Sequence, residues 1–330
     1  MAAAAVAAVA TFMLLACMPA YSDTLTLDFE PGTTLEPIEG RQAVRLRGPR
    51  KAGEPAGAAA RLAPPMLYFE AGDASQRQAH LVPDPDTPSN QVLEFALMSA
   101  NVALRSENTD REVRKGRVQM DVYGNAGVAE VYQAVRVRLA DGFRQLAEAD
   151  EPFAWLTLSE WWNDAGWTGE TYPFRISLDL GNRGAQGQRG LFLQARATLK
   201  PAGAREWSTQ VWAQRADGWS LPVDQWFLME TWFREGGTDQ GRFVVAVTPA
   251  AGARRVLIDV TGPTHHPAQT APDGLRHFNP IKLYTSGRTV ALARRTATKL
   301  AVLWDDLSIQ ACSRALGNQP SACERAMWRR

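Results

Sequence analysis

The chain is a succession of short strand-like segments, and this pattern restricts the folds open to it. From residue 91 onward, alternating apolar and polar residues recur between turns rich in Gly, Asp, Asn or Pro. About a dozen strands at this spacing, without a long helical period, predict an antiparallel β-sandwich. Residues 141–150 are expected to form one or two helical turns, whereas 289–293 and 299–310 are expected to be late strands. No repeat period indicates a propeller or a solenoid.

Length and composition favour one large domain. The 330 residues are 45% hydrophobic and 22% charged, which is enough apolar content for a sizeable core. Two domains would also fit this length, but a single sandwich over 23–311 is the preferred interpretation. Residues 47–90, rich in Gly, Pro, Ala and Arg, are predicted to form a loop-rich insertion, and 312–330 a C-terminal tail. The net charge of +1, with scattered basic residues, argues against nucleic acid as a partner.

The N-terminal segment has the features of an export signal. Residues 2–20 are apolar and uncharged, and Ala20-Tyr21-Ser22 fits the small-x-small cleavage rule, so 1–22 is predicted to be a signal peptide. One alternative is a membrane-spanning helix, which Pro19 would interrupt, and another is a lipoprotein signal with Cys17 as the lipidated residue. We therefore expect an exported protein that is periplasmic, secreted or lipid-anchored. No later segment is apolar enough to span a membrane, and we expect a monomer.

The cysteines predict a structural role. Cys312 and Cys323 remain once Cys17 is removed or lipidated. In an exported protein this pair is expected to form a disulfide that closes a short loop near the C-terminus. No CxxC motif or Cys/His spacing indicates a zinc site.

Tryptophan is concentrated in the middle of the chain. Nine of the eleven tryptophans fall between Trp155 and Trp232, in two runs that also contain acids, 153–164 and 226–235. Both runs read as strands, so residues two apart share a face. Aromatic rings stack on the C–H faces of sugars, while acids and amides bind their hydroxyls. The runs therefore indicate a sugar-binding face, and the alternative is that the rings fill the space between two sheets. The candidates are the stacking residues Trp161, Trp162, Trp226 and Trp232 and the polar residues Glu160, Asn163, Arg175 and Glu230.

Both ends of the predicted sandwich carry acids. Asp28-Phe-Glu30 opens it, and Leu300-Ala-Val-Leu-Trp-Asp-Asp-Leu-Ser-Ile309 closes it. These motifs resemble the jelly-roll carbohydrate-binding fold, in which the first and last strands meet and hold a structural calcium. The resemblance implies oxygen ligands from Glu30 and Asp306, which suit that hard cation. The alternative is that Asp305 and Asp306 pair with nearby Arg or Lys.

Two further motifs resemble another jelly-roll family. Leu104-Arg-Ser-Glu107 and Asn279-Pro-Ile-Lys-Leu-Tyr-Thr-Ser286 look like the early and late strands of concanavalin-A-like polysaccharide lyases of the alginate and heparin lyase type. The resemblance implies a concanavalin-A-like β-jelly-roll that cleaves a uronate-containing glycan on its concave face by β-elimination. The chain departs from the family pattern at 156–163, where a Gln-x-His motif is expected and no histidine occurs.

Such a reaction needs a group that neutralises the uronate carboxylate and a group that transfers protons. Arg105, Asn163, Arg175 and Lys282 are candidates for the first task. Tyr284 is the first candidate for proton transfer, because a nearby Lys282 or Arg would favour its ionised form. Alternatives are His265, His266 and His277; Glu160 is a further catalytic candidate, and Glu107 and His265 are candidates for substrate binding.

Two other functions remain open. A glycoside hydrolase would need two carboxylates across a cleft, and Glu107, Glu160 and Glu230 are available, although no jelly-roll glucanase motif occurs. A lectin would need the same aromatic surface without a proton-transfer group. A GxSxG motif, a P-loop and a dinucleotide fingerprint are all absent, so the sequence indicates no organic cofactor.

Overall fold

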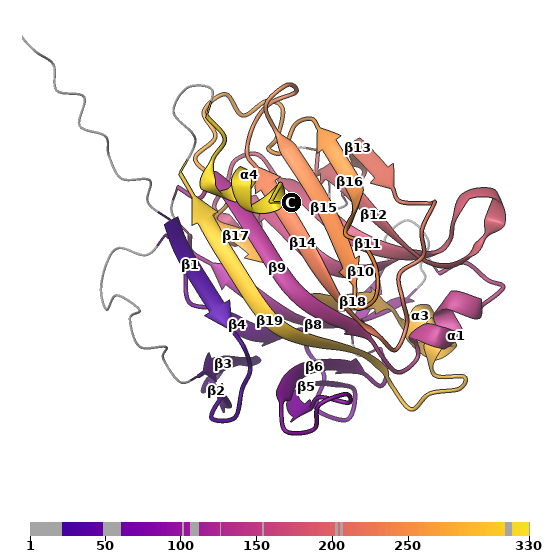
Figure 1. Ribbon diagram of the computed structural model, residues 1–330. Coiled ribbons are helices and arrows are strands. Elements are labelled where there is room, and N and C mark those ends of the chain that lie inside the picture. The colour runs from indigo at the N-terminus through magenta and orange to yellow at the C-terminus, as the bar shows by residue number, and fades with distance from the viewer. Residues whose placement is uncertain are drawn as a thin grey trace, which may run out of the picture.

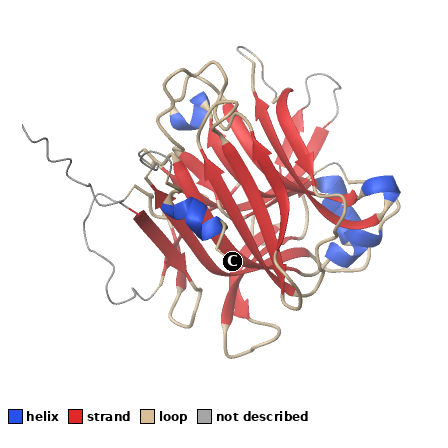
Figure 2. Cartoon of the chain, turned by 45° about the horizontal axis from the view of Figure 1, so that its top comes forward, coloured by secondary structure: helices blue, strands red, loops and turns tan. Residues whose placement is uncertain are grey.

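A computed structural model describes residues 22–48, 61–100, 102–105, 112–125, 127–153, 155–201, 204, 207–313 and 319–329. The described part is an all-β sandwich of two large antiparallel sheets, as Figures 1 and 2 show. The predicted jelly-roll sandwich class is therefore confirmed. The segment assigned to a signal peptide, 1–22, lies outside the described residues apart from Ser22, as does Cys17.

Among the described residues, one sheet contains eight strands and lies across the front of Figure 1. Its order is β16 (Arg255–Thr261), β15 (Arg242–Pro249), β14 (Trp226–Arg234), β9 (Glu130–Leu139), β19 (Leu300–Cys312), β6 (Gln91–Leu97) and β5 (Arg77–Pro83), with β1 (Ser22–Leu27) against β19. The first and last strands of the sandwich thus meet, as the terminal motifs predicted.

The other sheet contains eleven strands among the described residues. Its order is β13 (Thr209–Arg215), β12 (Arg189–Leu199), β11 (Phe174–Arg183), β10 (Leu156–Asn163), β17 (His277–Asn279), β8 (Glu112–Tyr123), β4 (Met66–Phe69), β3 (Ala43–Arg47) and β2 (Thr34–Pro37); β18 (Lys282–Ser286) pairs with both β10 and β8, and β7 (Val102–Arg105) pairs with β8. The late motif at 279–286 therefore lies in the middle of this sheet.

The core lies between the sheets. Leu158, Trp161 and Leu178 of the eleven-stranded sheet and Phe227 and Phe243 of the eight-stranded sheet are buried there. Trp161 meets Phe243 edge to face, with ring centroids 4.8 Å apart. Burying each such side chain stabilises the fold by about 1.5–3 kcal/mol, so the inward faces of the strands hold the sheets together.

The helices are short; most lie at the ends of the sandwich, and the C-terminal one lies over the eight-stranded sheet (Figure 2). They are α1 (Phe143–Glu148), α2 (Ala165–Thr168), α3 (Gly287–Ala293) and α4 (Ala322–Met327), with a 3₁₀ turn at Ala185–Gly187. The helical turns expected at 141–150 correspond to α1. Among the described residues, every helix is too short to cross a bilayer.

The strand predicted at 289–293 is wrong, because this segment belongs to helix α3. The hydroxyl of Ser286 accepts a hydrogen bond from the backbone N–H of Thr289 (3.2 Å), which caps the first turn. Thr289, Val290, Leu292 and Ala293 are buried, and their spacing fits one face of a helix. Over so few residues, alternation cannot distinguish the two periods.

The segment 47–90 contributes to both sheets. Strand β4 pairs with β8 in the eleven-stranded sheet, and strand β5 pairs with β6 in the eight-stranded sheet. Tyr68 and Phe69, expected as a short ordered piece, belong to β4. The predicted loop-rich insertion therefore contains two strands of the sandwich, with 49–60 outside the described residues.

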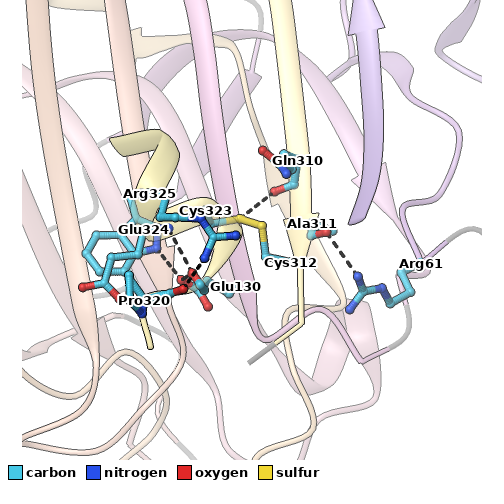
Figure 3. The surroundings of a disulfide bond; sticks show 11 residues. Arg61, Glu130, Gln310, Ala311, Cys312, Pro320, Cys323, Glu324 and Arg325 are labelled. Atoms are coloured by element: carbon cyan, nitrogen blue, oxygen red, sulfur yellow. Dashed lines mark hydrogen bonds between the residues drawn. A yellow bond between two sulfur atoms is a disulfide. The ribbon is translucent and has the colours of Figure 1, made fainter. Parts of the chain in front are cut away.

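A disulfide joins Cys312 to Cys323, as the sequence predicted (Figure 3). It connects the end of β19 to helix α4, which lies over the outer face of the eight-stranded sheet in Figure 1. Cys312, Cys323 and Met327 form a small buried cluster with Trp232. The C-terminal tail is thus packed against the sandwich.

Candidate functional site

Charged side chains line the outer face of the eleven-stranded sheet, which is the face turned away from the core. In β8, Gly116, Val118, Met120 and Val122 alternate with polar residues, and the three larger apolar side chains belong to the core. The polar residues therefore point outward. They are Lys115, Arg117, Gln119 and Asp121, and all four are nevertheless buried.

Lys282 and Glu160 form an ion pair at the centre of this face. The ammonium of Lys282 donates to a carboxylate oxygen of Glu160 and to Oδ1 of Asn279 (3.2 Å). Lys282 is 0% exposed and Glu160 is 1% exposed. Burial lowers the pKa of Lys282 to about 8, although Glu160 partly offsets it. Burial alone would raise the pKa of Glu160, but Lys282 and Arg175 outweigh this effect and hold that pKa below its ordinary value.

Further charges flank the pair. Arg175 of β11 lies 3.6 Å from the Glu160 carboxylate. On the other side, the carboxylate of Glu70 accepts from Arg117 (2.5 Å) and Lys115 (2.9 Å). We call Glu70, Lys115, Arg117, Glu160, Arg175 and Lys282 the charge cluster.

Tyr284 lies beside the charge cluster. Three cations approach its ring centroid: Lys115 (5.3 Å), Arg117 (5.0 Å) and Lys282 (5.1 Å). Burial nevertheless raises the pKa of Tyr284 to about 12, although Arg117 lowers it. The arginines thus act in the expected direction, since Arg117 and Arg175 favour the ionised phenol, but desolvation outweighs them. At neutral pH the phenol is therefore protonated.

A second polar group surrounds His277. Its Nε2 lies 3.3 Å from Asp121 Oδ1, which also accepts from Asn279 (2.5 Å) and Gln119 (2.6 Å). The ring is stacked with Trp167, at 5.7 Å between centroids, and His277 is 1% exposed. Trp167 also contacts Arg117, so it lies between the histidine and the charge cluster.

Aromatic rings cover this face. Trp162 is nearly parallel to Trp167 at 6.0 Å, and it donates from its indole N–H to Asn279 Oδ1 (3.1 Å). Trp162 is only 8% exposed, whereas Trp167 is 38% exposed. Trp167 is therefore the ring of this stack that a sugar could reach. Trp155 contacts Tyr284 with ring centroids 4.3 Å apart.

A pocket of about 180 Å³ lies beside Trp155, the ring that contacts Tyr284. Its lining includes Trp155, Asp179, Arg183, Gln194 and Arg196. Asp179 is opposite Thr157 on β10, and Thr157 is in turn opposite Tyr284 on β18. The pocket thus continues the polar face sideways across the sheet.

The structure brings together five of the predicted site residues, namely Glu160, Trp162, Arg175, Lys282 and Tyr284. Two residues predicted beside them face elsewhere. Trp161 is 2% exposed in the core between the sheets. Asn163 is opposite Phe174, a core residue, and is itself buried. Neither is placed to contact a substrate on the outer face.

The predicted candidates on β14 lie on the wrong sheet for this site. Trp226, Glu230 and Trp232 share one face, as expected, but it is the outer face of the eight-stranded sheet. Their polar atoms have local partners: Trp226 donates to Asp84 (3.1 Å), Trp232 to Glu130 (2.8 Å), and Glu230 accepts from Arg254 (2.5 Å) and Tyr132 (2.7 Å). The core separates them from Tyr284.

The remaining candidates are scattered. Arg105 ends strand β7 at the edge of β8, and its side chain is not among those described; Glu107 lies outside the described residues. His265 is buried in the loop after β16, where its Nδ1 lies 2.9 Å from the carbonyl of His266. No contact joins either histidine to the charge cluster in the described part of the chain.

The two predicted calcium ligands are both exposed. Asp306 lies 3.5 Å from Arg136, and Asp305 pairs with the same guanidinium at 3.0 Å, so the alternative of arginine pairing is observed. No group of three or more His, Cys, Asp or Glu residues within the described ranges is placed to hold a metal ion. Calcium at Glu30 and Asp306 stays a prediction.

Several residues of this face were not predicted from the sequence as site residues: Arg117, Lys115, Asn279, Trp155 and Trp167. A signal for the first two was present, because Lys115, Arg117, Gln119 and Asp121 alternate with apolar residues in one strand. Glu70 carried no such signal, since it follows a short strand inside a loop-rich segment.

The sequence matches no protein-family model, and no curated protein is similar to it. Solved structures with a similar arrangement include the endo-β-1,4-glucuronan lyase of the fungus Trichoderma reesei, with TM-score 0.45, 11% identity, and coverage of 73% of this chain and 89% of that one. A marine PL-14 alginate lyase from Aplysia kurodai has TM-score 0.43 and 11% identity over 74% of this chain and 89% of that one. The exoplasmic/lumenal domain of VIP36, in a Ca²⁺- and mannose-bound form, has TM-score 0.38 and 11% identity over 77% of this chain and 85% of that one.

Proposed function

We propose that this chain is a polysaccharide lyase that cleaves a uronate-containing glycan by β-elimination. The observation that carries the proposal is the position of Tyr284, a protonated phenol among three cations and one aromatic ring away from a polar pocket. A phenol with a pKa of about 12 can donate a proton, and nearby cations can stabilise negative charge that develops on a substrate.

The reaction divides between these groups. Arg117 and Arg175 flank the centre and can pair with the uronate carboxylate, which makes the proton on C5 more acidic. Lys282 adds positive charge beneath them. A base takes the C5 proton, a role for which His277 is the predicted alternative that lies on this face. The electron pair then forms the C4–C5 double bond, and the C4–O bond breaks. Tyr284 donates its proton to the departing oxygen.

The hydrolase alternative has little support from the geometry. Glu160 is fully buried in its ion pair, and Glu230 lies on the outer face of the other sheet. Glu160 and Asp164 do not form a pair on one strand either, because β10 ends at Asn163 and Asp164 caps α2. Two carboxylates across one cleft would be required.

A non-catalytic sugar-binding protein is the second candidate. The partly exposed Trp167 and the ring of Trp155 support sugar binding as well as they support a lyase. A proton donor distinguishes the two functions, because binding does not require one. Export is part of the proposal as well, since the disulfide between Cys312 and Cys323 fits an oxidising compartment. A structural calcium bound by Glu30 and Asp306 would show as raised thermal stability on calcium addition that Asp306→Asn removes.

The test uses purified protein with alginate, glucuronan, pectic and heparin-type polysaccharides. Ultraviolet absorbance reports the unsaturated uronate, and reducing ends report any chain cleavage. We expect both to rise with one substrate, and Tyr284→Phe to lower the rate by about 100-fold or more while ligand affinity persists. The phenylalanine ring preserves the contact with Trp155, so loss of folding is not expected. Reducing ends without absorbance would indicate a hydrolase, and binding without either signal would indicate a lectin.

A further inference from the structure

The pocket beside Trp155 is rich in arginine. Arg183, Arg196 and Arg215 all contribute to its lining, together with one acid, Asp179. Asp179 is already saturated: it accepts from Arg196 (2.6 Å), from the Thr157 hydroxyl (2.7 Å) and from the Ser177 hydroxyl (2.9 Å). The pocket therefore has more positive than negative charge.

Arg183 supplies the excess positive charge of the pocket. Its guanidinium donates to the carbonyl oxygens of Asn182 (2.9 Å) and Asp150, and no carboxylate contacts it in the described part of the chain. Arg215, in contrast, pairs with Asp217 (3.0 Å). Carbonyl groups fix the direction of a guanidinium without cancelling its charge. Arg183 is thus held in place as a cation, which is the arrangement that binds a carboxylate with little ordering cost.

The remaining walls suit a sugar ring. Trp155, Phe153 and Leu180 provide apolar surface, and the amide of Gln194 can bond hydroxyl groups. The volume of about 180 Å³ is roughly six times the ~30 Å³ that one water occupies in the liquid, which is room for one monosaccharide.

The position relative to Tyr284 follows from the strand register. Tyr284 on β18 is opposite Thr157 on β10, which is opposite Asp179 on β11. Two strand spacings of about 4.8 Å separate Tyr284 from the near wall of the pocket by roughly 10 Å. A glycan with its scissile bond at Tyr284 would place an adjoining sugar there.

We propose that this pocket binds the carboxylate of a second uronate next to the one that is cleaved, with Arg183 as the principal cation. The inference rests on the proposed function and narrows it. A chain with uronates at adjoining positions is a polyuronate, whereas a glycan that alternates uronate with neutral sugar would leave Arg183 unpaired. Polyuronates are therefore the substrate class.

The test measures binding separately from turnover. Calorimetric titration with a uronate trisaccharide, and with its methyl ester, is carried out on Tyr284→Phe protein so that no cleavage occurs. We expect Arg183→Gln to weaken binding of the acid by about tenfold to a hundredfold and to leave binding of the ester unchanged. Gln194→Glu, which adds a negative charge at similar size, should act in the same direction. Arg47→Gln, at an exposed pair on the opposite edge of the sheet, is the matched control and should change nothing.

Kinetics on polymers complete the test. In otherwise unmodified protein, Arg183→Gln should lower kcat/KM on a polyuronate and leave the slower rate on an alternating polymer unchanged. Equal affinity of acid and ester for the unsubstituted pocket, or unaltered acid binding in both pocket variants, would overturn the subsite while lyase activity stood. If no polymer yields the unsaturated product but Arg183→Gln still abolishes the preference for the acid, the lyase fails and the uronate pocket stands.

Discussion

Removing the charge of Glu160 tests whether the charge cluster is desolvated. Glu160→Gln would leave the Lys282 ammonium, which is 0% exposed, without its carboxylate partner and close to other cations. Breaking a buried ion pair in this way typically costs about 3–5 kcal/mol. Lys282→Met should cost less, nearer ~2 kcal/mol, because Arg175 remains 3.6 Å from Glu160 to compensate its charge.

Urea unfolding of both single variants and of the double variant measures the coupling. The double variant removes both charges together, so we expect its cost to be smaller than the summed single costs by about 2 kcal/mol. Glu36→Gln provides the matched control, since Glu36 pairs with Arg47 at 3.0 Å but is about half exposed, and its loss should cost at most ~1 kcal/mol. If Glu160→Gln cost no more than Glu36→Gln, or if the single costs were additive, the reasoning about a buried and coupled pair would be refuted.

Three other outcomes follow from the structure. The pKa of Lys282 is about 8 in the folded protein and about 10.4 in the unfolded chain, so the unfolded chain binds more protons between these values. The free energy of unfolding should therefore rise from pH 8 to pH 10. Unfolding measured across this pH range should show a flatter rise for Lys282→Met. Trp161→Ala should destabilise the fold by about 3–5 kcal/mol without changing the affinity of the folded protein for a glycan, as calorimetry and thermal melts would show. The disulfide joins cysteines that are 11 residues apart, and its loss in Cys323→Ser should lower the free energy of unfolding by about 3 kcal/mol in denaturant titrations. An unchanged unfolding midpoint would contradict the role of the disulfide in fixing α4.

Alternation along the chain predicted the sandwich and the faces of its strands, but not which sheet each strand joins. Trp226, Glu230 and Trp232 share a face as expected, yet strand pairing puts that face on the opposite side of the core from Tyr284. Alternation every two residues predicts only which side chains share a face of the strand. Sheet membership depends on contacts between residues far apart in sequence, which one strand's pattern does not contain.

The same limit explains what was found and missed in the site. Lys282 and Glu160 are 122 residues apart, and the pairing of β10 with β17 and β18 brings them together. The assignment of both residues to one site came from a family resemblance and a tryptophan-rich run, not from their spacing. Arg117 was recognisable as an outward residue of its strand, but its partners Glu70 and Tyr284 come from distant segments.

The charge cluster is better explained by binding than by stability. The outer face of an antiparallel sheet normally faces water, and here it bears buried cations under a layer of aromatic rings. Replacing a buried ion pair by apolar residues of similar volume is often neutral or stabilising, so a sheet selected for stability alone would not need one. Fixed cations in a partly dry environment do have a use at a site where negative charge must be bound or must develop. The arrangement of Arg117, Arg175 and Lys282 around Tyr284 therefore supports a site for an anionic ligand on this face.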